Sequence, residues 1–114
     1  MKLVMSQNQE EADGTSLVGY MPYGTTYEQL VKAFGQPILY TEADGDKVDA
    51  EWVGWIDDQL FTIYNYKTGH VYLGSEGIFF KDLVGDDWHI GGRDSRVVDL
   101  IVEHVSRYES IEDD

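Results

Sequence analysis

A short segment near the C-terminal end of the chain combines residue types that bind anions. Gly91 and Gly92 permit a close approach of the backbone, and Arg93 and Arg96 are two of only eight lysines and arginines in the chain. A helix beginning here would add N–H groups that lack intrahelical acceptors. The segment therefore predicts a phosphate-binding corner. In the alternative interpretation, the glycines only let a strand turn into a helix, and Asp94 accepts from the helix N–H groups itself.

Aromatic and basic side chains elsewhere extend this candidate site. Tyr64 or Trp88 can stack on a nucleobase, while Lys67 and His89 can donate hydrogen bonds to phosphate. Packing against the predicted helices is the alternative role of the aromatic residues. The complete predicted ligand-binding set is Tyr64, Lys67, Trp88, His89, Gly91, Gly92, Arg93 and Arg96.

Catalysis has little support from these residues. His89 with Asp86 or Asp87 and the Ser95 hydroxyl supplies the residue types of a hydrolase. The chain has no nucleophile elbow, however, and 22 acidic residues place some carboxylate near every histidine. We therefore predict a non-enzymatic protein without catalytic residues.

The residue spacing does not favour a metal site either. The chain has no cysteine and no His-x-Glu-x-x-His pattern, and Glu103 with His104 is an isolated pair. The run from Asp44 to Asp46 lacks the later glycine and glutamate of a calcium loop. We predict neither a metal nor another cofactor.

The overall charge restricts the partners. The 114 residues include 22 Asp and Glu against 8 Lys and Arg, which gives a formal net charge of −14. Because phosphate contacts supply most non-specific affinity for nucleic acids, this charge disfavours direct binding to DNA or RNA. A basic protein surface is a compatible partner, and solubility alone is the simpler reason for the charge. No run of about 18 apolar residues occurs, so we expect no membrane partner.

Hydrophobic spacing predicts the elements that position these residues. Residues 26–34 and 95–108 have the apolar periodicity of two amphipathic helices. Residues 38–66 alternate with a period of two and predict about three antiparallel strands, and 88–90 add another. Residues 67–87 are punctuated by glycines and predict a loop-rich crossover. Together these elements predict an α+β fold with a single antiparallel sheet of about four or five strands and both helices on one face.

The chain is too short for two domains, and its ends differ from its body. Ala12 is the only apolar side chain in residues 6–16, so we expect residues 1–16 to form a flexible acidic arm, while 109–114 predict an acidic tail. Residues 17–108 form the single predicted domain, which starts with a short edge strand at 17–23. The absence of cysteine fits a reducing compartment.

Four segments carry a resemblance to known proteins. Residues 27–37, 46–52 and 62–67, together with the Trp-His-Ile-Gly-Gly run at 88–92, resemble a widespread family of small uncharacterised bacteriophage proteins. The turn at Asp57 and Asp58 departs from the Asp-Gly hairpin more common in such proteins, which leaves the hairpin register open. The resemblance implies that the protein acts in the cytoplasm of an infected host cell.

Two functions are compatible with the residues and the resemblance. In the favoured one, the protein counters host defence by sequestering a nucleotide-type immune signal, a small phosphate-bearing ligand. In the alternative, its acidic body mimics nucleic acid and inhibits a host defence nuclease or CRISPR effector by occupying a basic protein surface. The sequence leaves the oligomeric state open, a homo-oligomer included.

Overall fold

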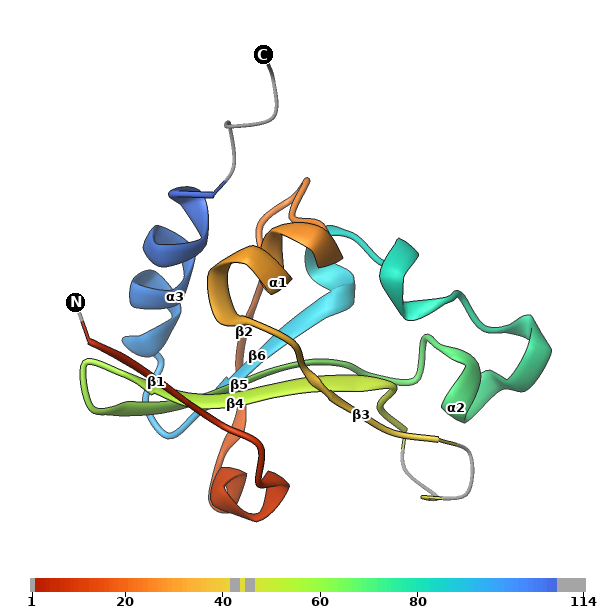
Figure 1. Cartoon of the computed structure of the whole chain (residues 1–114), viewed down its shortest axis with the longest axis horizontal. Helices are drawn as coiled ribbons and strands as arrows, with labels where there is room; N and C mark the ends of the chain where they lie inside the picture. Colours follow the sequence, from red (N-terminus) through yellow and green to blue (C-terminus); the bar gives the residue numbers. More distant parts are fainter. Residues whose placement is uncertain (1, 42–43, 45–46, 109–114) are drawn as a thin grey trace.

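The computed structural model describes residues 2–41, 44 and 47–108 and has an α+β fold. Its antiparallel sheet has the strand order β1-β4-β5-β6-β2, with β3 paired to the end of β4 (Figure 1). The strands are β1 (Leu3–Ser6), β2 (Ser16–Tyr20), β3 (Ile38–Leu39), β4 (Ala50–Ile56), β5 (Gln59–Asn65) and β6 (Trp88–Gly92). The helices are α1 (Tyr27–Phe34), α2 (His70–Leu73) and α3 (Val97–Ser106). The predicted fold class is thereby confirmed.

Helix α1 begins and ends where the sequence predicts. The Thr26 hydroxyl accepts from the Gln29 N–H at 3.1 Å, and the Gln29 side chain accepts from the Thr26 N–H at 3.4 Å, which completes a capping box. Gly35 ends the helix at φ 88°, a conformation that favours glycine. These local signals fix the length of α1 independently of the rest of the fold.

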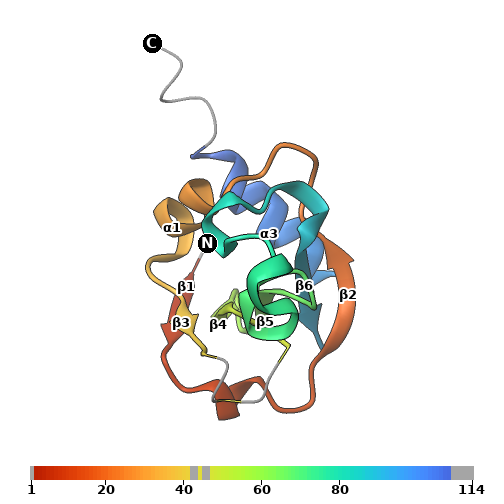
Figure 2. The same ribbon diagram turned by 90° about the vertical axis from the view of Figure 1, so that its right-hand side faces the viewer.

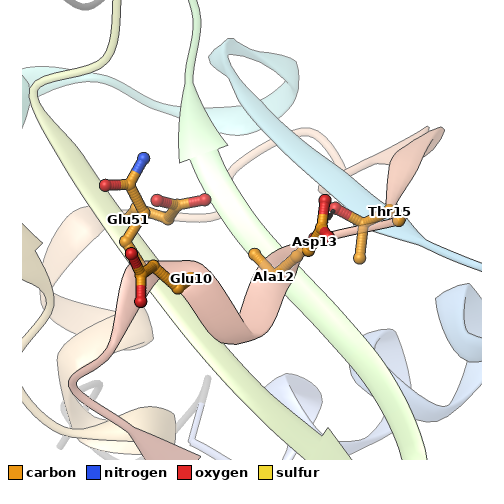
Figure 3. Close-up of a pocket in the computed structure, with 7 residues that line it drawn as sticks. Glu10, Ala12, Asp13, Thr15 and Glu51 are labelled. Atoms are coloured by element: carbon orange, nitrogen blue, oxygen red, sulfur yellow. Dashed lines mark hydrogen bonds between the residues drawn. The ribbon is translucent and has the colours of Figure 1, made fainter.

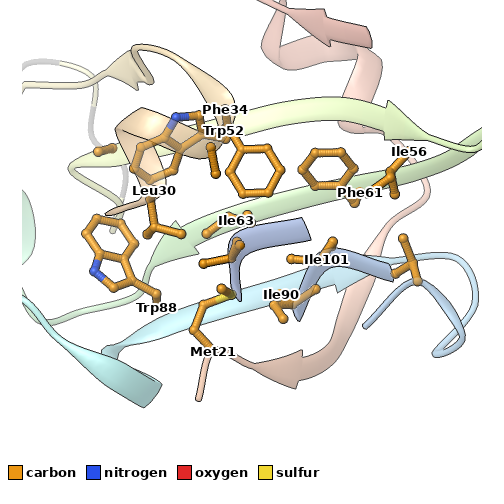
Figure 4. Packing of buried hydrophobic residues seen from close by; sticks show 14 of the residues in the cluster. Met21, Leu30, Phe34, Trp52, Ile56, Phe61, Ile63, Trp88, Ile90 and Ile101 are labelled. Atoms are coloured by element: carbon orange, nitrogen blue, oxygen red, sulfur yellow. The ribbon is translucent and has the colours of Figure 1, made fainter. Parts of the chain in front are cut away.

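The buried core lies between the sheet and the helices α1 and α3 (Figure 4). Trp52 from β4, Ile63 from β5 and Ile90 from β6 face Leu30 of α1 and Ile101 of α3. The His104 Nε2 of α3 donates to the Ala33 carbonyl of α1 at 2.8 Å, so the two helices are also joined by a hydrogen bond. The prediction that the core residues of both helices and the central strands are buried together is confirmed for Leu30, Phe34, Trp52, Ile63, Ile90, Val97 and Ile101.

The crossover from β5 to β6 has little regular structure, as predicted. Residues 66–87 contain the four-residue helix α2 and three single turns of 3-10 helix. Figure 1 shows α2 at one end of the sheet, away from α1 and α3, and in Figure 2 this end faces the viewer, with the green helix in front of the strands. No helix in the described part of the chain is long and apolar enough to cross a membrane.

The N-terminal segment departs from the predicted flexible arm over 1–16. Strand β1 pairs with β4 from Leu3 opposite Ile56 to Ser6 opposite Val53, and a turn of 3-10 helix, η1 (Gln9–Ala12), follows. The free edge of β4 supplies backbone partners, and the side chains of Leu3 and Met5 pack against the core. Few apolar residues are therefore sufficient to order this segment.

The hairpin between β4 and β5 has a defined register despite its unusual turn. Ile56 pairs with Gln59, so Asp57 and Asp58 form a two-residue loop with φ values of 48° and 66°. Two positive φ values are typical of a type I′ turn, which favours glycine at its second position. The register that the sequence left open is the one expected of an Asp-Gly hairpin.

We expect Asp58→Gly to raise the free energy of unfolding by about 0.5–1 kcal/mol, because glycine adopts a positive φ without steric cost. Denaturant titration at unchanged m-value measures this gain. Asp57→Asn is the control, since it removes a charge at the neighbouring position and keeps a side-chain acceptor for the Lys2 N–H. A larger gain from Asp57→Asn than from Asp58→Gly would mean that charge repulsion, and not backbone conformation, limits the turn.

Candidate functional site

The face of the sheet opposite α1 and α3, here called the outer face, carries a row of polar and aromatic side chains. The pairing of four neighbouring strands aligns Glu51 of β4 with Tyr64 of β5, Tyr64 with His89 of β6, and His89 with Tyr20 of β2. Directly opposed residues in antiparallel strands have Cβ atoms about 4.5–5.5 Å apart. We call Glu51, Tyr64, His89 and Tyr20 the outer row.

His89 is the centre of an aromatic cluster on this row. Its ring centroid lies 4.9 Å from that of Tyr20 and 5.5 Å from that of Tyr64, both in edge-on arrangements. Tyr66, two residues after Tyr64 on the same face, lies 6.1 Å from His89. Tyr20 is 50% exposed and Tyr66 is 41% exposed, so planar surface on either side of His89 remains accessible.

Lys67 places a positive charge beside the cluster. Its Nζ lies 5.3 Å from the ring centroid of Tyr66 and 5.5 Å from that of Tyr72, which are cation–π distances. The backbone of Lys67 has a φ of 63°, a left-handed conformation that disfavours side chains with a Cβ. A strained non-glycine residue often marks a functional position.

The protonation of the row follows from its half-buried setting. Burial lowers the pKa of His89, although the carboxylates of Asp86 and Asp87 raise it in part. Burial also raises the pKa of Tyr64, as does the nearby carboxylate of Glu51. At neutral pH the row therefore presents a neutral imidazole at His89 and an intact phenol at Tyr64, which are hydrogen-bond donors without a full positive charge.

Two adjoining hollows run along this face beneath η1. The larger, of about 580 Å³, lies between η1 and Glu51 and is bordered by Glu10, Asp13 and Thr15 (Figure 3). The smaller, of about 230 Å³, continues from Glu51 to Tyr64 and Tyr66. The following residues line both hollows: Gln9, Thr15 and Glu51. The outer row thus opens at its Glu51 end into a space that can hold a small molecule.

The predicted ligand-binding residues divide between the two faces of the sheet. Tyr64 and His89 come together on the outer face, and Lys67 contacts the neighbouring Tyr66 ring. Trp88 is completely buried in the core, where its Nε1 donates to the Leu83 carbonyl at 3.1 Å. Neither face of its ring is accessible to a nucleobase, so the prediction that Trp88 stacks on a ligand is wrong. The same alternation along β6 that exposes His89 directs Trp88 inward.

The two glycines serve packing in this structure. A Cβ at Gly91 would clash with the Thr62 hydroxyl, and one at Gly92 would lie 2.9 Å from Val97. Both residues are buried in β6. The two glycines allow neighbouring protein side chains to approach closely. No space therefore remains beside their backbone for the anion that the sequence predicted there.

At the predicted phosphate-binding corner, the carboxylate of Asp94 occupies the position expected for a bound anion. Helix α3 begins at Val97, and the Asp94 carboxylate accepts from the Arg96 backbone N–H at 2.9 Å and from the Arg96 guanidinium at 2.6 and 3.0 Å. These bonds hold the pKa of Asp94 at about 2. The N–H groups of Val97 and Val98 donate to backbone carbonyls. The geometry agrees with the alternative interpretation, in which Asp94 satisfies the helix start.

Arg93 is engaged elsewhere, at the opposite end of β6 from His89. Its Nη2 donates to the Asp13 carbonyl at 3.1 Å, and a Cβ at Gly14 would lie 3.4 Å from its Nε. Arg93 therefore connects the N-terminal segment to the sheet. It follows His89 by four positions along the chain, a distance of about 13 Å in extended strand.

A buried polar network positions the start of the crossover next to the row. Asn65 is fully buried, and its carbonyl oxygen accepts from the N–H groups of Asp49 and Ala50 at 2.8 and 3.2 Å. Its amide nitrogen donates to the Asp49 carboxylate at 2.9 Å and to the Thr68 hydroxyl at 3.2 Å. Lys67 lies between Asn65 and Thr68, so this network determines where its side chain emerges.

Sequence reasoning missed Glu51, Tyr20 and Tyr66 as members of the site. The alternation of β5 places Tyr66 on the same face as Tyr64, and this signal is present in the sequence. The positions of Tyr20 and Glu51 depend on which strands pair and in which register, and no local pattern encodes that pairing.

Within the part of the chain that the structure describes, no group of three or more His, Asp or Glu side chains could hold a metal ion. Around the outer row, the described residues offer aromatic surface, phenol and imidazole donors, the Glu51 carboxylate and the Lys67 ammonium group. Comparison of the chain with protein-family models, curated proteins and solved structures gives no match.

Proposed function

We propose that this protein is a non-enzymatic binding protein that sequesters a nucleotide-type signal on the outer face of its sheet. The observation that carries the proposal is the outer row, which places aromatic rings, hydrogen-bond donors and the ammonium of Lys67 on one accessible surface. Aromatic side chains stack on nucleobases, and an ammonium group with neutral donors binds phosphate.

The segments that carry the resemblance to phage proteins supply most of this surface. Residues 46–52 contribute Glu51, residues 62–67 contribute Tyr64, Tyr66 and Lys67, and the Trp-His-Ile-Gly-Gly run contributes His89. The apolar residues of these segments pack in the core, so their polar residues are the ones available for binding. In a phage protein this function would remove an immune signal from the cytoplasm of the host.

Isothermal titration of the full chain with AMP, cyclic di-AMP and ADP-ribose tests the proposal. We expect at least one of these compounds to bind with one site per chain. Inorganic phosphate and adenosine are the controls, because each offers only one of the two groups that the site would recognise. An absence of heat with all three nucleotides would contradict the proposal.

The affinity for such a ligand should rise as the pH falls from 7.5 to 5.5. The pKa of His89 lies below its usual 6.5 in the free protein, so the imidazole is neutral at pH 7.5 and binds a proton more readily as the pH falls. A bound phosphate stabilises the imidazolium, so binding is accompanied by proton uptake. Titration in buffers of different ionisation enthalpy measures that uptake.

The matched variant for this pH dependence is His89→Gln, which keeps a hydrogen-bond donor without a titrating charge. We expect its affinity to be nearly independent of pH over the same window. If the wild-type affinity falls as the pH is lowered, His89 does not face the phosphate.

A second candidate function is favoured by the carboxylates around the larger hollow. Glu10, Asp13 and Glu51 border this space, and none of the described residues that line it is a lysine or an arginine. A basic protein surface, as in a nuclease, is the partner that such a border attracts. This inhibitor function predicts a complex that weakens steeply with added salt, whereas binding of a nucleotide between aromatic rings depends less on salt.

A further inference from the structure

We infer that two copies of this chain associate through the crossover between β5 and β6, by way of exposed apolar side chains on and after α2. These side chains are Tyr72, Leu73, Ile78 and Phe79, here called the crossover patch, and each is between 44% and 51% exposed. Large apolar side chains gathered on the surface of a small protein mark a contact with a partner. The inference goes beyond the proposed nucleotide binding and does not depend on it.

The crossover patch is contiguous because the chain folds back beside α2. The Ile78 N–H donates to the Thr68 carbonyl at 2.9 Å, which brings the segment after η3 (Gly74–Glu76) next to the start of α2. The ring centroid of Phe79 lies 6.4 Å from that of His70, the first residue of α2. The last two residues of α2 supply the rest of the patch.

Polar contacts, and not the patch, hold the crossover in this shape. The buried carboxylate of Asp49 accepts from the Val71 N–H at 3.3 Å, and the His70 Nδ1 donates to the Gly74 carbonyl at 2.7 Å. The patch side chains stay half exposed, so their burial contributes little to the folding of a single chain. Their apolar character therefore serves contact with another surface, and the ordered backbone lowers the entropic cost of that contact.

The distribution of charge favours a second copy of the chain as the partner. Residues 70–81 contain one acid, Glu76, and one base, Lys81, so this segment is neutral within a chain of net charge −14. Two copies repel each other at their acidic surfaces, and contact through a neutral segment avoids this repulsion. Because α2 lies at one end of the sheet, an end-to-end contact also keeps the acidic bodies apart (Figure 1). A strongly basic partner would instead be attracted to the acidic remainder of the chain.

The two charges make the crossover patch self-complementary. In a dimer with two-fold symmetry, every contact between a residue of one copy and a second residue of its partner occurs twice. Glu76 and Lys81 are exposed, and within the described part of the chain neither forms an ion pair. They flank Ile78 and Phe79 in the sequence, so Glu76 of each copy can pair with Lys81 of the other beside the apolar contact.

Sedimentation equilibrium of the full chain over a range of concentrations tests the inference. Four half-exposed side chains cover less than the roughly 800 Å² per partner that a standard interface buries. We therefore expect a reversible dimer with a dissociation constant on the order of 10–100 µM. A chain that remains monomeric up to about 1 mM, well above that range, would overturn the inference.

Leu73→Ser should weaken the dimer at least about tenfold, because two-fold symmetry places the lost apolar contact in the interface twice. Leu39→Ser is the matched control, since Leu39 is 58% exposed but lies on β3, outside the crossover patch. Both variants should keep the wild-type thermal midpoint at low protein concentration, because both leucines are exposed. Equal dimerisation of the two variants would overturn the inference.

Charge reversal tests the pairing across the two-fold axis. Glu76→Lys and Lys81→Glu each place like charges opposite one another, so each variant alone should dimerise several-fold more weakly than the wild type. A mixture of the two variants restores opposite charges at both pairs, so the mixed dimer should be tighter than either variant dimer. A net-charge effect alone would give the mixed dimer an intermediate strength, and that result would overturn the two-fold contact.

Discussion

Replacement of Asn65 by alanine is expected to lower the free energy of unfolding by about 3–5 kcal/mol. The substitution leaves the N–H groups of Asp49 and Ala50 without their acceptor, and each buried unsatisfied group costs about 1–3 kcal/mol. It also removes a donor to the Asp49 carboxylate, which is only 4% exposed. The cavity left by the side chain adds to this cost. Denaturant titration measures the change.

Thr68→Ala is the control for this network, because it removes one side-chain bond to Asn65 and leaves no backbone N–H group unsatisfied. We expect it to cost about 1 kcal/mol or less. A loss below 1 kcal/mol in Asn65→Ala would show that water or local rearrangement replaces the Asn65 bonds. The network would then not be what holds the start of the crossover beside the outer row.

Replacement of Lys67 by glycine is expected to weaken nucleotide binding by at least about tenfold, the loss of one charge-assisted contact worth about 1.5–3 kcal/mol. The thermal midpoint should be unchanged or higher, because glycine adopts the φ of 63° at this position without strain. Isothermal titration and thermal unfolding of the same preparation separate the two effects.

Lys81→Ala is the matched control for this charge. Lys81 is also exposed and lies 5.8 Å from the ring centroid of Phe79, but it is not on the outer face. Removal of Lys81 should leave the affinity within about twofold. If both variants weaken binding equally, the effect comes from the net charge of the protein and not from the position of Lys67.

The helices and the core could be predicted from local patterns. Thr26, Gln29 and Gly35 mark the ends of α1 by side-chain and backbone chemistry that operates within a few residues. The apolar periodicity of α3 likewise identified Val97 and Ile101 as buried. Such elements are predictable because their signals and their partners lie in the same stretch of chain.

Strand β1 and the predicted phosphate-binding corner show why other parts of the fold and of the site were not predicted. Strand β1 is only four residues long and depends on the free edge of β4, which is some fifty residues away in the sequence. At the corner, residue types alone did not distinguish an arginine that binds a ligand from one that binds Asp94. Both outcomes depend on which groups tertiary structure brings together.

Alternation along β6 shows how the site could have been predicted better. Trp88 and Ile90 share one face of the strand and His89 lies on the other. Because Ile90 is a clear core residue, Trp88 should have been assigned to the core with it. The same reasoning on β5 adds Tyr66 to Tyr64, whereas the alignment of Glu51 and Tyr20 with them required the strand register.

An NMR titration of isotope-labelled full chain with AMP, cyclic di-AMP and ADP-ribose tests most directly whether the outer face binds a nucleotide. We predict that the largest shifts fall on Tyr20, Glu51, Tyr64, Lys67 and His89, with the backbone signals of the α3 start nearly unchanged. Shifts concentrated on residues 93–98, or no shifts with any of the three nucleotides, would contradict the account.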